Sequence, residues 1–178
     1  MNLFKGILSI AILLTVASCT KQENTGKQYF YFDVEGFFKA EASRLDQVNP
    51  NVSKTVRKNK DTETRNLKID DWQTELELFK SSDINKPAWR NSYKTETKGG
   101  LISYTATSPE LRTRNLVIEK DGTGKVKRIS TANEVSNPLY SSTEILEYYP
   151  DSLYKIQKKQ NVKLLGENTY FISGKIKD

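Results

Sequence analysis

From Ser92 to the C-terminus the apolar side chains recur at every second residue, and this period restricts the fold more than any other feature. In the last segment, for example, Tyr170, Ile172 and Ile176 fall on one side of an extended chain. Such alternation is typical of β-strands with one buried face. The pattern predicts strands over residues 93–98, 101–107, 111–120, 125–132, 142–149, 153–164 and 169–177.

The segments between these strands are short and contain residues that favour tight turns. They are Gly99-Gly100, Asp121-Gly122-Thr123-Gly124, Pro150-Asp151-Ser152 and Gly166-Glu167-Asn168. No helical pattern separates the strands, so each strand should pair antiparallel with its neighbour in sequence.

The part of the chain before Ser92 predicts two helices and a hairpin. An apolar stripe at helical spacing indicates a helix over 33–48, with Asp33 as N-cap and a stop at Asn49-Pro50. Gly36 should weaken its start. Strands over 52–58 and 64–69 would form the hairpin, and a second helix should begin with Asp70 as N-cap.

Together these elements predict an α+β domain: a curved antiparallel β-meander of about seven to nine strands, with two helices packed on one face. A sheet of this size could close into a half-barrel. The residues expected in the helix-on-sheet core are Phe37, Phe38, Trp72, Leu76, Phe79, Val117, Ile129, Leu146, Ile156 and Ile172. In outline this shape resembles the lipoprotein-carrier folds of the bacterial envelope.

The N-terminus has the layout of a secretory signal peptide. Lys5 precedes an apolar run over 6–16, and two small residues then lead to Cys19, the only cysteine. The run is about eleven residues long, whereas a membrane-spanning helix needs roughly twenty. A signal peptide over residues 1–18 is therefore the better interpretation.

The sequence Val16-Ala17-Ser18-Cys19 resembles the lipobox of bacterial lipoproteins. The resemblance implies that Cys19 is lipidated, that 19–28 form a flexible spacer, and that 29–178 are a single domain. Position 20 is Thr rather than the Asp that retains lipoproteins in the inner membrane. We therefore expect an outer-membrane anchor, with the domain facing the periplasm or the cell surface. The alternative is a plain signal peptide cleaved elsewhere.

The composition excludes several chemistries. The chain has no His and one Cys, so Ser-His-Asp and Cys-His catalysis, His or Cys metal sites and disulfides within the domain cannot form. The turn at Asp121 has one acidic residue where a calcium loop needs several. We therefore expect no catalytic residues, no metal and no cofactor.

The formal net charge is +6, from 28 basic and 22 acidic residues. A basic envelope protein could meet anionic lipids or glycans. The basic residues are scattered, however, and alternate along the predicted strands, which a solvated sheet face explains equally well. Without a nucleic-acid-binding motif, nucleic acid is not expected as a partner.

Aromatic residues are the best candidates for a binding surface, because Tyr combines an apolar ring with a hydroxyl group. The candidates are Trp89, Tyr148, Tyr154 and Tyr170. The alternatives remain open: the tyrosines could pack across strands, and Trp89 could anchor its loop under the sheet edge.

The resulting hypothesis is a non-enzymatic, monomeric envelope lipoprotein that binds a hydrophobic small molecule, such as a lipid, or another envelope protein. The alternative is a carboxylate-dependent glycan-processing enzyme, which would need two carboxylates converging in a cleft, one with a raised pKa.

Overall fold

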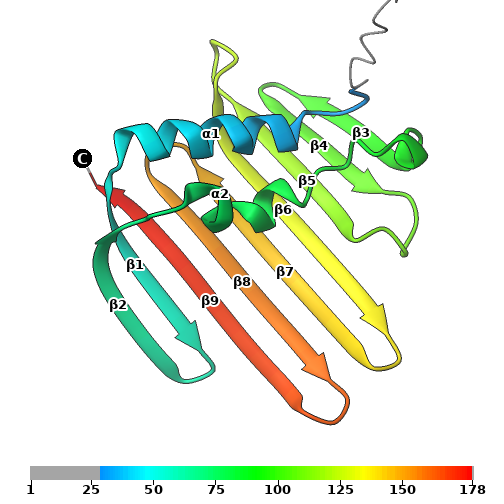
Figure 1. Cartoon of the computed structure of the whole chain (residues 1–178). Coiled ribbons are helices and arrows are strands. Elements are labelled where there is room, and N and C mark those ends of the chain that lie inside the picture. Colours follow the sequence, from blue (N-terminus) through cyan, green and yellow to red (C-terminus); the bar gives the residue numbers. More distant parts are fainter. Residues whose placement is uncertain (1–28, 178) are drawn as a thin grey trace, which may run out of the picture.

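The structure is a computed structural model and describes residues 29–177. Most of this range forms a nine-stranded antiparallel sheet (Figure 1). The strands are β1 Asn51–Lys58, β2 Asp61–Lys68, β3 Tyr93–Lys98, β4 Leu101–Ala106, β5 Thr113–Lys120, β6 Val126–Asn137, β7 Tyr140–Tyr149, β8 Leu153–Val162 and β9 Gly166–Lys177. The helices are α1 Val34–Val48, α2 Trp72–Glu75, α3 Glu77–Lys80 and the 3₁₀ turn η1 Pro87–Trp89.

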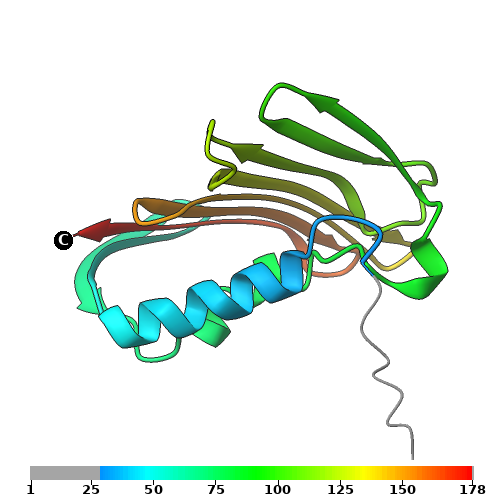
Figure 2. The same cartoon turned by 90° about the horizontal axis from the view of Figure 1, so that it is seen from above.

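The strand order is β2-β1-β9-β8-β7-β6-β5-β4-β3, so the predicted meander from β3 to β9 is confirmed. The early hairpin β1–β2 is added beyond the last strand, with Val52 opposite Ile176 and Val56 opposite Ile172. The sheet is curved and twisted but open, because β2 and β3 remain its two edges (Figure 2). The predicted α+β class is confirmed, and the sheet does not close.

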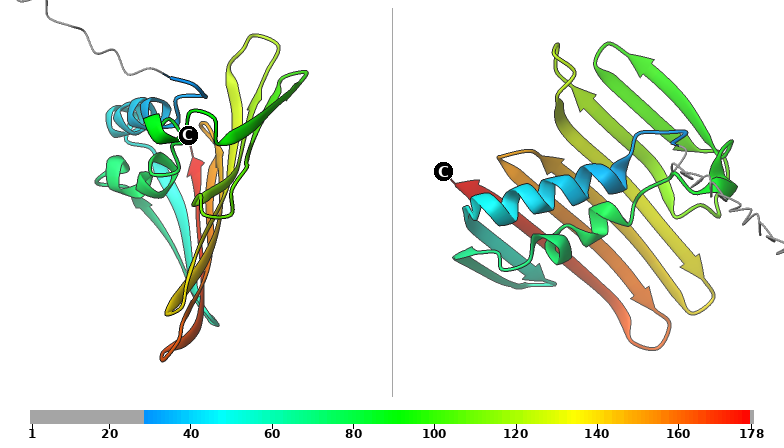
Figure 3. Two further views of the ribbon diagram at one scale, coloured as in Figure 1. Left: turned by 90° about the vertical axis from the view of Figure 1, so that its right-hand side faces the viewer. Right: turned by 45° about the horizontal axis from the view of Figure 1, so that its top comes forward.

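All the helices that pack on the sheet cover the same face, and α1 crosses the strands there (Figures 2 and 3). The helix begins as predicted, since the Asp33 side chain accepts a hydrogen bond of 2.8 Å from the Gly36 backbone N–H. A Cβ atom at Gly36 would lie 2.1 Å from Asp33 Oδ2. The glycine that was expected to weaken the helix therefore makes room for its N-cap.

The second predicted helix differs from expectation in two ways. Its N-cap is Asp71 rather than Asp70, and the Asp71 side chain accepts a hydrogen bond from the Thr74 backbone N–H at 3.1 Å. The helix is also interrupted at Leu76, which separates α2 from α3. The predicted N-cap is thus wrong by one residue. Two consecutive Asp residues can each act as an N-cap, and the sequence does not distinguish between them.

The core between helices and sheet matches most of the prediction. Seven of the residues expected there are buried: Phe38, Trp72, Leu76, Phe79, Ile129, Leu146 and Ile156. Phe37 and Ile172 pack against the core while partly exposed. Val117 was wrongly assigned, because its neighbours Leu116 and Ile118 point to the helices and are fully buried. Val117 shares its strand face with Asn115 and Glu119, whereas Leu116 and Ile118 form the apolar pair, so the alternation itself favours the set that is buried.

Two buried tyrosines connect the helices to the middle of the sheet. Tyr148 and Tyr154 are cross-strand partners on β7 and β8. The Tyr148 hydroxyl donates to Glu41 of α1 at 2.7 Å, and the Tyr154 hydroxyl donates to Glu75 of α2 at 2.5 Å. Burial, and then the adjacent carboxylate, raise the pKa of both phenols far above its usual value.

A buried amide holds the N-terminal segment at three backbone positions. Asn85, only 3% exposed, accepts hydrogen bonds from the backbone N–H groups of Phe30 and Tyr31 and donates to the Phe32 carbonyl. Every helix, strand and core residue of the described chain lies between Val34 and Lys177. Residues 29–177 therefore contain a complete core of their own, while the predicted signal peptide, Cys19 and the spacer lie outside the described residues.

Candidate binding surface

The structure does not bring the four predicted aromatic residues together. Tyr148 and Tyr154 are both 0% exposed and lie beneath the helices, so they are core residues rather than part of a surface. Their positions could have been anticipated, because each lies two residues from a predicted core residue, Leu146 or Ile156, on the same strand face.

Trp89 lies beside β3, at one edge of the sheet, whereas Tyr170 lies on β9, the third strand from the other edge. Trp89 ends η1 and packs near Tyr93 of β3, with their ring centroids 6.4 Å apart. The Lys86 ammonium lies 4.2 Å from the Trp89 ring centroid, which covers its outer side. These contacts match the interpretation of Trp89 as a loop anchor.

Tyr170 lies on the same side of β9 as Ile172 and Gly174, which face the core beneath the helices. The Lys58 ammonium lies 5.9 Å from its ring centroid. On the opposite face, the next cross-strand pair repeats this contact, because the Arg57 guanidinium lies 5.1 Å from the Phe171 ring centroid. Cation–aromatic pairs therefore occupy both faces of the β1–β9 ladder.

Phe171 belongs to a groove on the face of the sheet that lacks helices, and we call it the open-face groove. Its volume is about 450 Å³. The residues that line it are Arg57, Thr143, Ile145, Gln157, Lys158, Lys159, Thr169, Tyr170 and Phe171, so the predicted residue Tyr170 is among them. They come from four adjacent strands, β1, β9, β8 and β7. The sequence could not indicate this groove, because its two ends lie almost ninety residues apart along the chain.

The open-face groove combines apolar side chains with positive charge. Ile145 is 38% exposed and Phe171 is partly exposed, which leaves apolar surface between polar side chains. Lys159 forms an ion pair of 2.9 Å with Glu167, whereas Arg57 contacts no carboxylate among residues 29–177. The surface therefore suits a ligand that offers a carboxylate or phosphate next to an apolar group.

A second polar cluster lies on the helix-bearing face, just beyond α3. Glu144 is buried and forms ion pairs with Arg112 at 2.7 Å and Lys158 at 3.0 Å. Burial would raise the pKa of Glu144, but its hydrogen bond to Lys158 and the charge of Arg112 outweigh burial and lower it. Glu144 is thus held ionised, whereas a glycan-cleaving acid needs a raised pKa.

The Glu144 cluster also contains two polar atoms without a protein partner. Asn133 donates to Ser82 Oγ at 2.9 Å, while its own Oδ1 and the Ser142 hydroxyl have no hydrogen-bond partner among the described residues. Both atoms are buried. Glu144, Asn133 and Ser142 are all buried, so the cluster presents little surface to a substrate.

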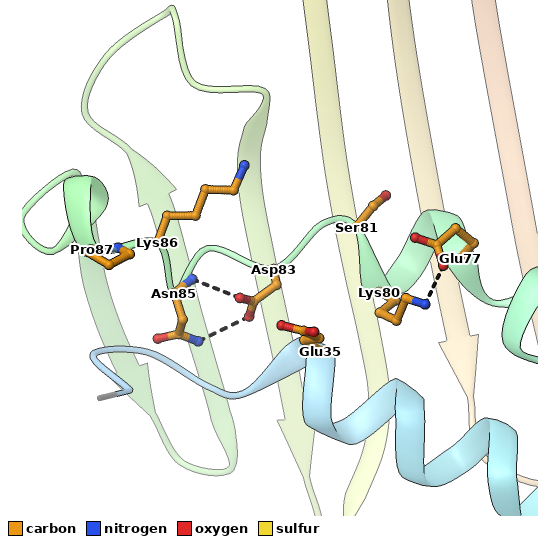
Figure 4. Close-up of a pocket in the computed structure, with 8 residues that line it drawn as sticks. All are labelled: Glu35, Glu77, Lys80, Ser81, Asp83, Asn85, Lys86 and Pro87. Carbon is orange, nitrogen blue, oxygen red and sulfur yellow. Dashed lines mark hydrogen bonds and ion pairs between the residues drawn. The ribbon is translucent and has the colours of Figure 1, made fainter. Parts of the chain in front are cut away.

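A further groove of about 440 Å³ lies between the start of α1 and the segment that leads from α3 to η1 (Figure 4). Its charged side chains are mostly satisfied within the protein. Lys80 forms an ion pair with Glu77, and Asp83 accepts hydrogen bonds from the backbone and side-chain amides of Asn85 (Figure 4). Asn85, which lines this groove, is also the residue that bonds the N-terminal segment.

Residues 29–177 contain no cluster of three acidic, His or Cys side chains that could hold a metal ion. No helix within the same range is long and apolar enough to cross a membrane. Comparison of the chain with protein-family models, with curated proteins and with solved structures finds no match.

Proposed function

We propose that this protein is a non-enzymatic lipoprotein of the bacterial cell envelope that binds another envelope protein through the open-face groove. The observation that carries the proposal is the groove itself: an apolar and basic surface on a sheet face that no helix covers. The lipobox-like sequence at Cys19 supports the proposed lipid anchor. Because Cys19 precedes the domain in the sequence, a lipid there would not occupy the sheet.

The filled interior favours a protein partner over a carried small molecule. A carrier needs a largely enclosed, apolar cavity. Between the helices and the sheet of the described chain, that space is taken by large side chains, including Phe38, Phe79 and Tyr148, whose ring centroids lie 5.1 to 5.9 Å apart. Binding is therefore expected at the outer surface.

The chemistry of the groove also indicates what kind of partner it would bind. Arg57 supplies a cation without an ion-pair partner among the described residues, and Ile145 and Phe171 supply apolar contact. An acidic protein segment with at least one apolar side chain matches both features. Aromatic and Arg side chains of this kind are the usual anchors of protein interfaces.

Photo-crosslinking in the native cells tests the proposal. A photoreactive amino acid would replace Thr143 beside the groove, and Thr105 of β4 would be the control position on the same sheet face. We expect one specific crosslinked product from position 143 and none from 105. The substitution Arg57→Glu should reduce this product at least about fivefold, the effect of losing one interface anchor.

A matched charge reversal separates the groove from the general charge of the protein. Lys94→Glu on the β3 edge removes the same charge far from the groove and should leave the crosslinked product unchanged. A product that persists in Arg57→Glu, or that is lost equally in both variants, would contradict the proposed interface.

A further inference from the structure

The most exposed large apolar side chains of the described residues lie on two adjacent hairpin turns. Leu139, in the β6–β7 turn, is 67% exposed, and Leu164 and Leu165, in the β8–β9 turn, are 93% and 80% exposed. Leucine is more often buried than exposed, and exposed apolar side chains that gather at one place often mark a surface that binds a protein or a membrane.

These turns are connected to one another and form a continuous rim, which we call the distal rim. The Lys163 backbone N–H donates to the Leu139 carbonyl at 3.1 Å, which joins the two leucine-bearing turns. The β1–β2 turn is joined in the same way, because the Asn59 backbone N–H donates to the Thr169 carbonyl at 2.9 Å. The leucines are therefore presented by an ordered backbone.

The distal rim is basic as well as apolar. Lys58, Lys60 and Lys163 are exposed on the turns or beside them, and none of the three forms an ion pair among residues 29–177. Two carboxylates lie on or beside the same turns: Glu167 is paired with Lys159, and Asp61 is exposed opposite Lys58. The rim therefore presents leucines beside an excess of cations.

We infer that the distal rim inserts its leucines into an anionic lipid bilayer, while its lysines contact the lipid headgroups. Apolar side chains at the headgroup boundary, combined with flanking lysines, are the physical requirements for binding a membrane surface. The inference concerns a different surface from the open-face groove and does not depend on the proposed partner protein.

The shape of the rim favours a bilayer over a protein. The turns protrude from the end of the sheet (Figures 1 and 3), and three leucines are far fewer than the roughly 20–30 residues on each side of a stable protein interface. A fluid bilayer accepts a narrow protrusion without a complementary pocket. The segment at residue 29 leaves the domain at the opposite end from the distal rim, so the rim is a second membrane contact, separate from the proposed lipid anchor (Figures 1 and 3).

Vesicle binding of residues 20–178 tests the inference, because this part of the chain contains the complete core. The probe is a vesicle of phosphatidylcholine with about 30% phosphatidylglycerol, and the reference is phosphatidylcholine alone. We expect flotation with the anionic vesicles, weakened by salt. The double substitution Leu164→Ser and Leu165→Ser should lower the partition coefficient at least about tenfold.

The matched control is Val48→Ser, which removes an apolar side chain of 60% exposure at the end of α1, away from the rim. It should leave vesicle binding unchanged. Leu164→Trp should show a blue-shifted emission on adding anionic vesicles, which reports insertion directly. Equal binding of the double variant and the parent, no flotation at millimolar lipid, or loss of a dimer in the double variant would each overturn the inference.

Discussion

Gly174 shows how closely single residues are fitted in the centre of the sheet. It lies opposite Tyr154 on the neighbouring strand, and a Cβ atom there would lie 2.1 Å from the Tyr154 ring. The ring cannot move away, since Tyr154 is fully buried, packs edge-to-face on Trp72 at 6.1 Å and donates to Glu75. The glycine is therefore required by packing.

We predict that Gly174→Ala lowers the free energy of unfolding by about 3 kcal/mol, at the upper end of the cost of overpacking a core. Urea unfolding followed by circular dichroism measures the change. Gly122→Ala is the matched control, because a Cβ atom at this turn position would meet nothing within 4 Å. Similar midpoints for the two variants would show that Tyr154 can give way.

The ionised state of Glu144 predicts a dependence of stability on pH. Its pKa is lowered in the folded protein, so the ion pairs with Arg112 and Lys158 stabilise the fold above the unfolded pKa of about 4.3. This contribution is lost as the pH falls through the lower folded pKa. Stability should therefore decrease on acidification below about pH 5.

Glu144→Gln tests this contribution, and we expect it to cost about 1–3 kcal/mol at pH 7, because two half-buried cations lose their partner. Near pH 2 the parent is itself protonated, so the difference between the two proteins should shrink. Urea unfolding at both pH values measures it. A cost that stays the same at the lower pH would mean that side-chain packing, rather than charge, is responsible.

Among the helices, the α2 start is the element where the local pattern and the structure differ. Asp70 and Asp71 are both exposed, yet only the Asp71 side chain accepts hydrogen bonds from the Thr74 amide and hydroxyl. The hydrogen bonds to the Thr74 side chain and backbone lower the pKa of Asp71. The backbone path between β2 and α2 thus decides which of the two Asp residues becomes the N-cap.

We predict that Asp71→Ala lowers the free energy of unfolding by about 1 kcal/mol, the usual cost of losing an N-cap. Asp70→Ala removes the same charge one residue earlier and should have an effect within about 0.5 kcal/mol of zero. Thermal unfolding of both variants measures the difference. Equal destabilisation would indicate that charge at the helix start matters more than the hydrogen bond.

The edge strands explain how an open sheet of nine strands can remain a monomer. β3 carries Lys94, Glu96 and Lys98, and β2 carries Asp61, Glu63 and Arg65, all exposed. Charged side chains on edge strands oppose pairing with a second sheet. The expectation of a monomer therefore has a physical basis in both edges.

In the whole molecule, the proposed lipid anchor and the distal rim would act at opposite ends of the domain. Phe30 and Tyr31 are bonded to Asn85, and all the buried core residues of the described chain follow them in the sequence. Removing the anchor should thus leave the fold unchanged. It should also show how much of the membrane attachment the domain provides by itself.

We predict that Cys19→Ser releases the protein from the membrane fraction after a high-salt wash. The remaining contact through the rim should be weak, because leucines and lysines on three turns bind a bilayer reversibly. Fractionation with and without salt measures both contributions, and the unfolding midpoint of the purified variant checks the fold. Protein that stays in the membrane fraction after the wash would contradict the lipobox interpretation, or would mean that an apolar surface of the domain, such as the distal rim, binds the membrane strongly by itself.

The sequence alone was enough to predict the existence of the strands, the first helix and the antiparallel order from β3 to β9. Two turns were missed: the β6–β7 turn after Asn137 was not predicted, and the β8–β9 turn lies at 163–165 rather than at Gly166-Glu167-Asn168, which belongs to β9. The features that were predicted depend on neighbouring residues: side chains alternate along a strand, and turn residues stand next to the segments that they join. The burial of Phe38, Trp72 and Ile129 follows from the same local periods. The existence and the order of these strands could therefore be predicted from the sequence.

Only the tertiary structure decided which face of each strand is covered and which distant segments meet. The helices cover the face of β5 that carries Leu116 and Ile118 and leave Val117 on the other face. The pairing of β1 with β9 brings Arg57 to Phe171, and the stagger of the hairpins places Leu139 beside the β8–β9 turn. Both candidate surfaces arise from contacts between segments remote in sequence, which no local period records.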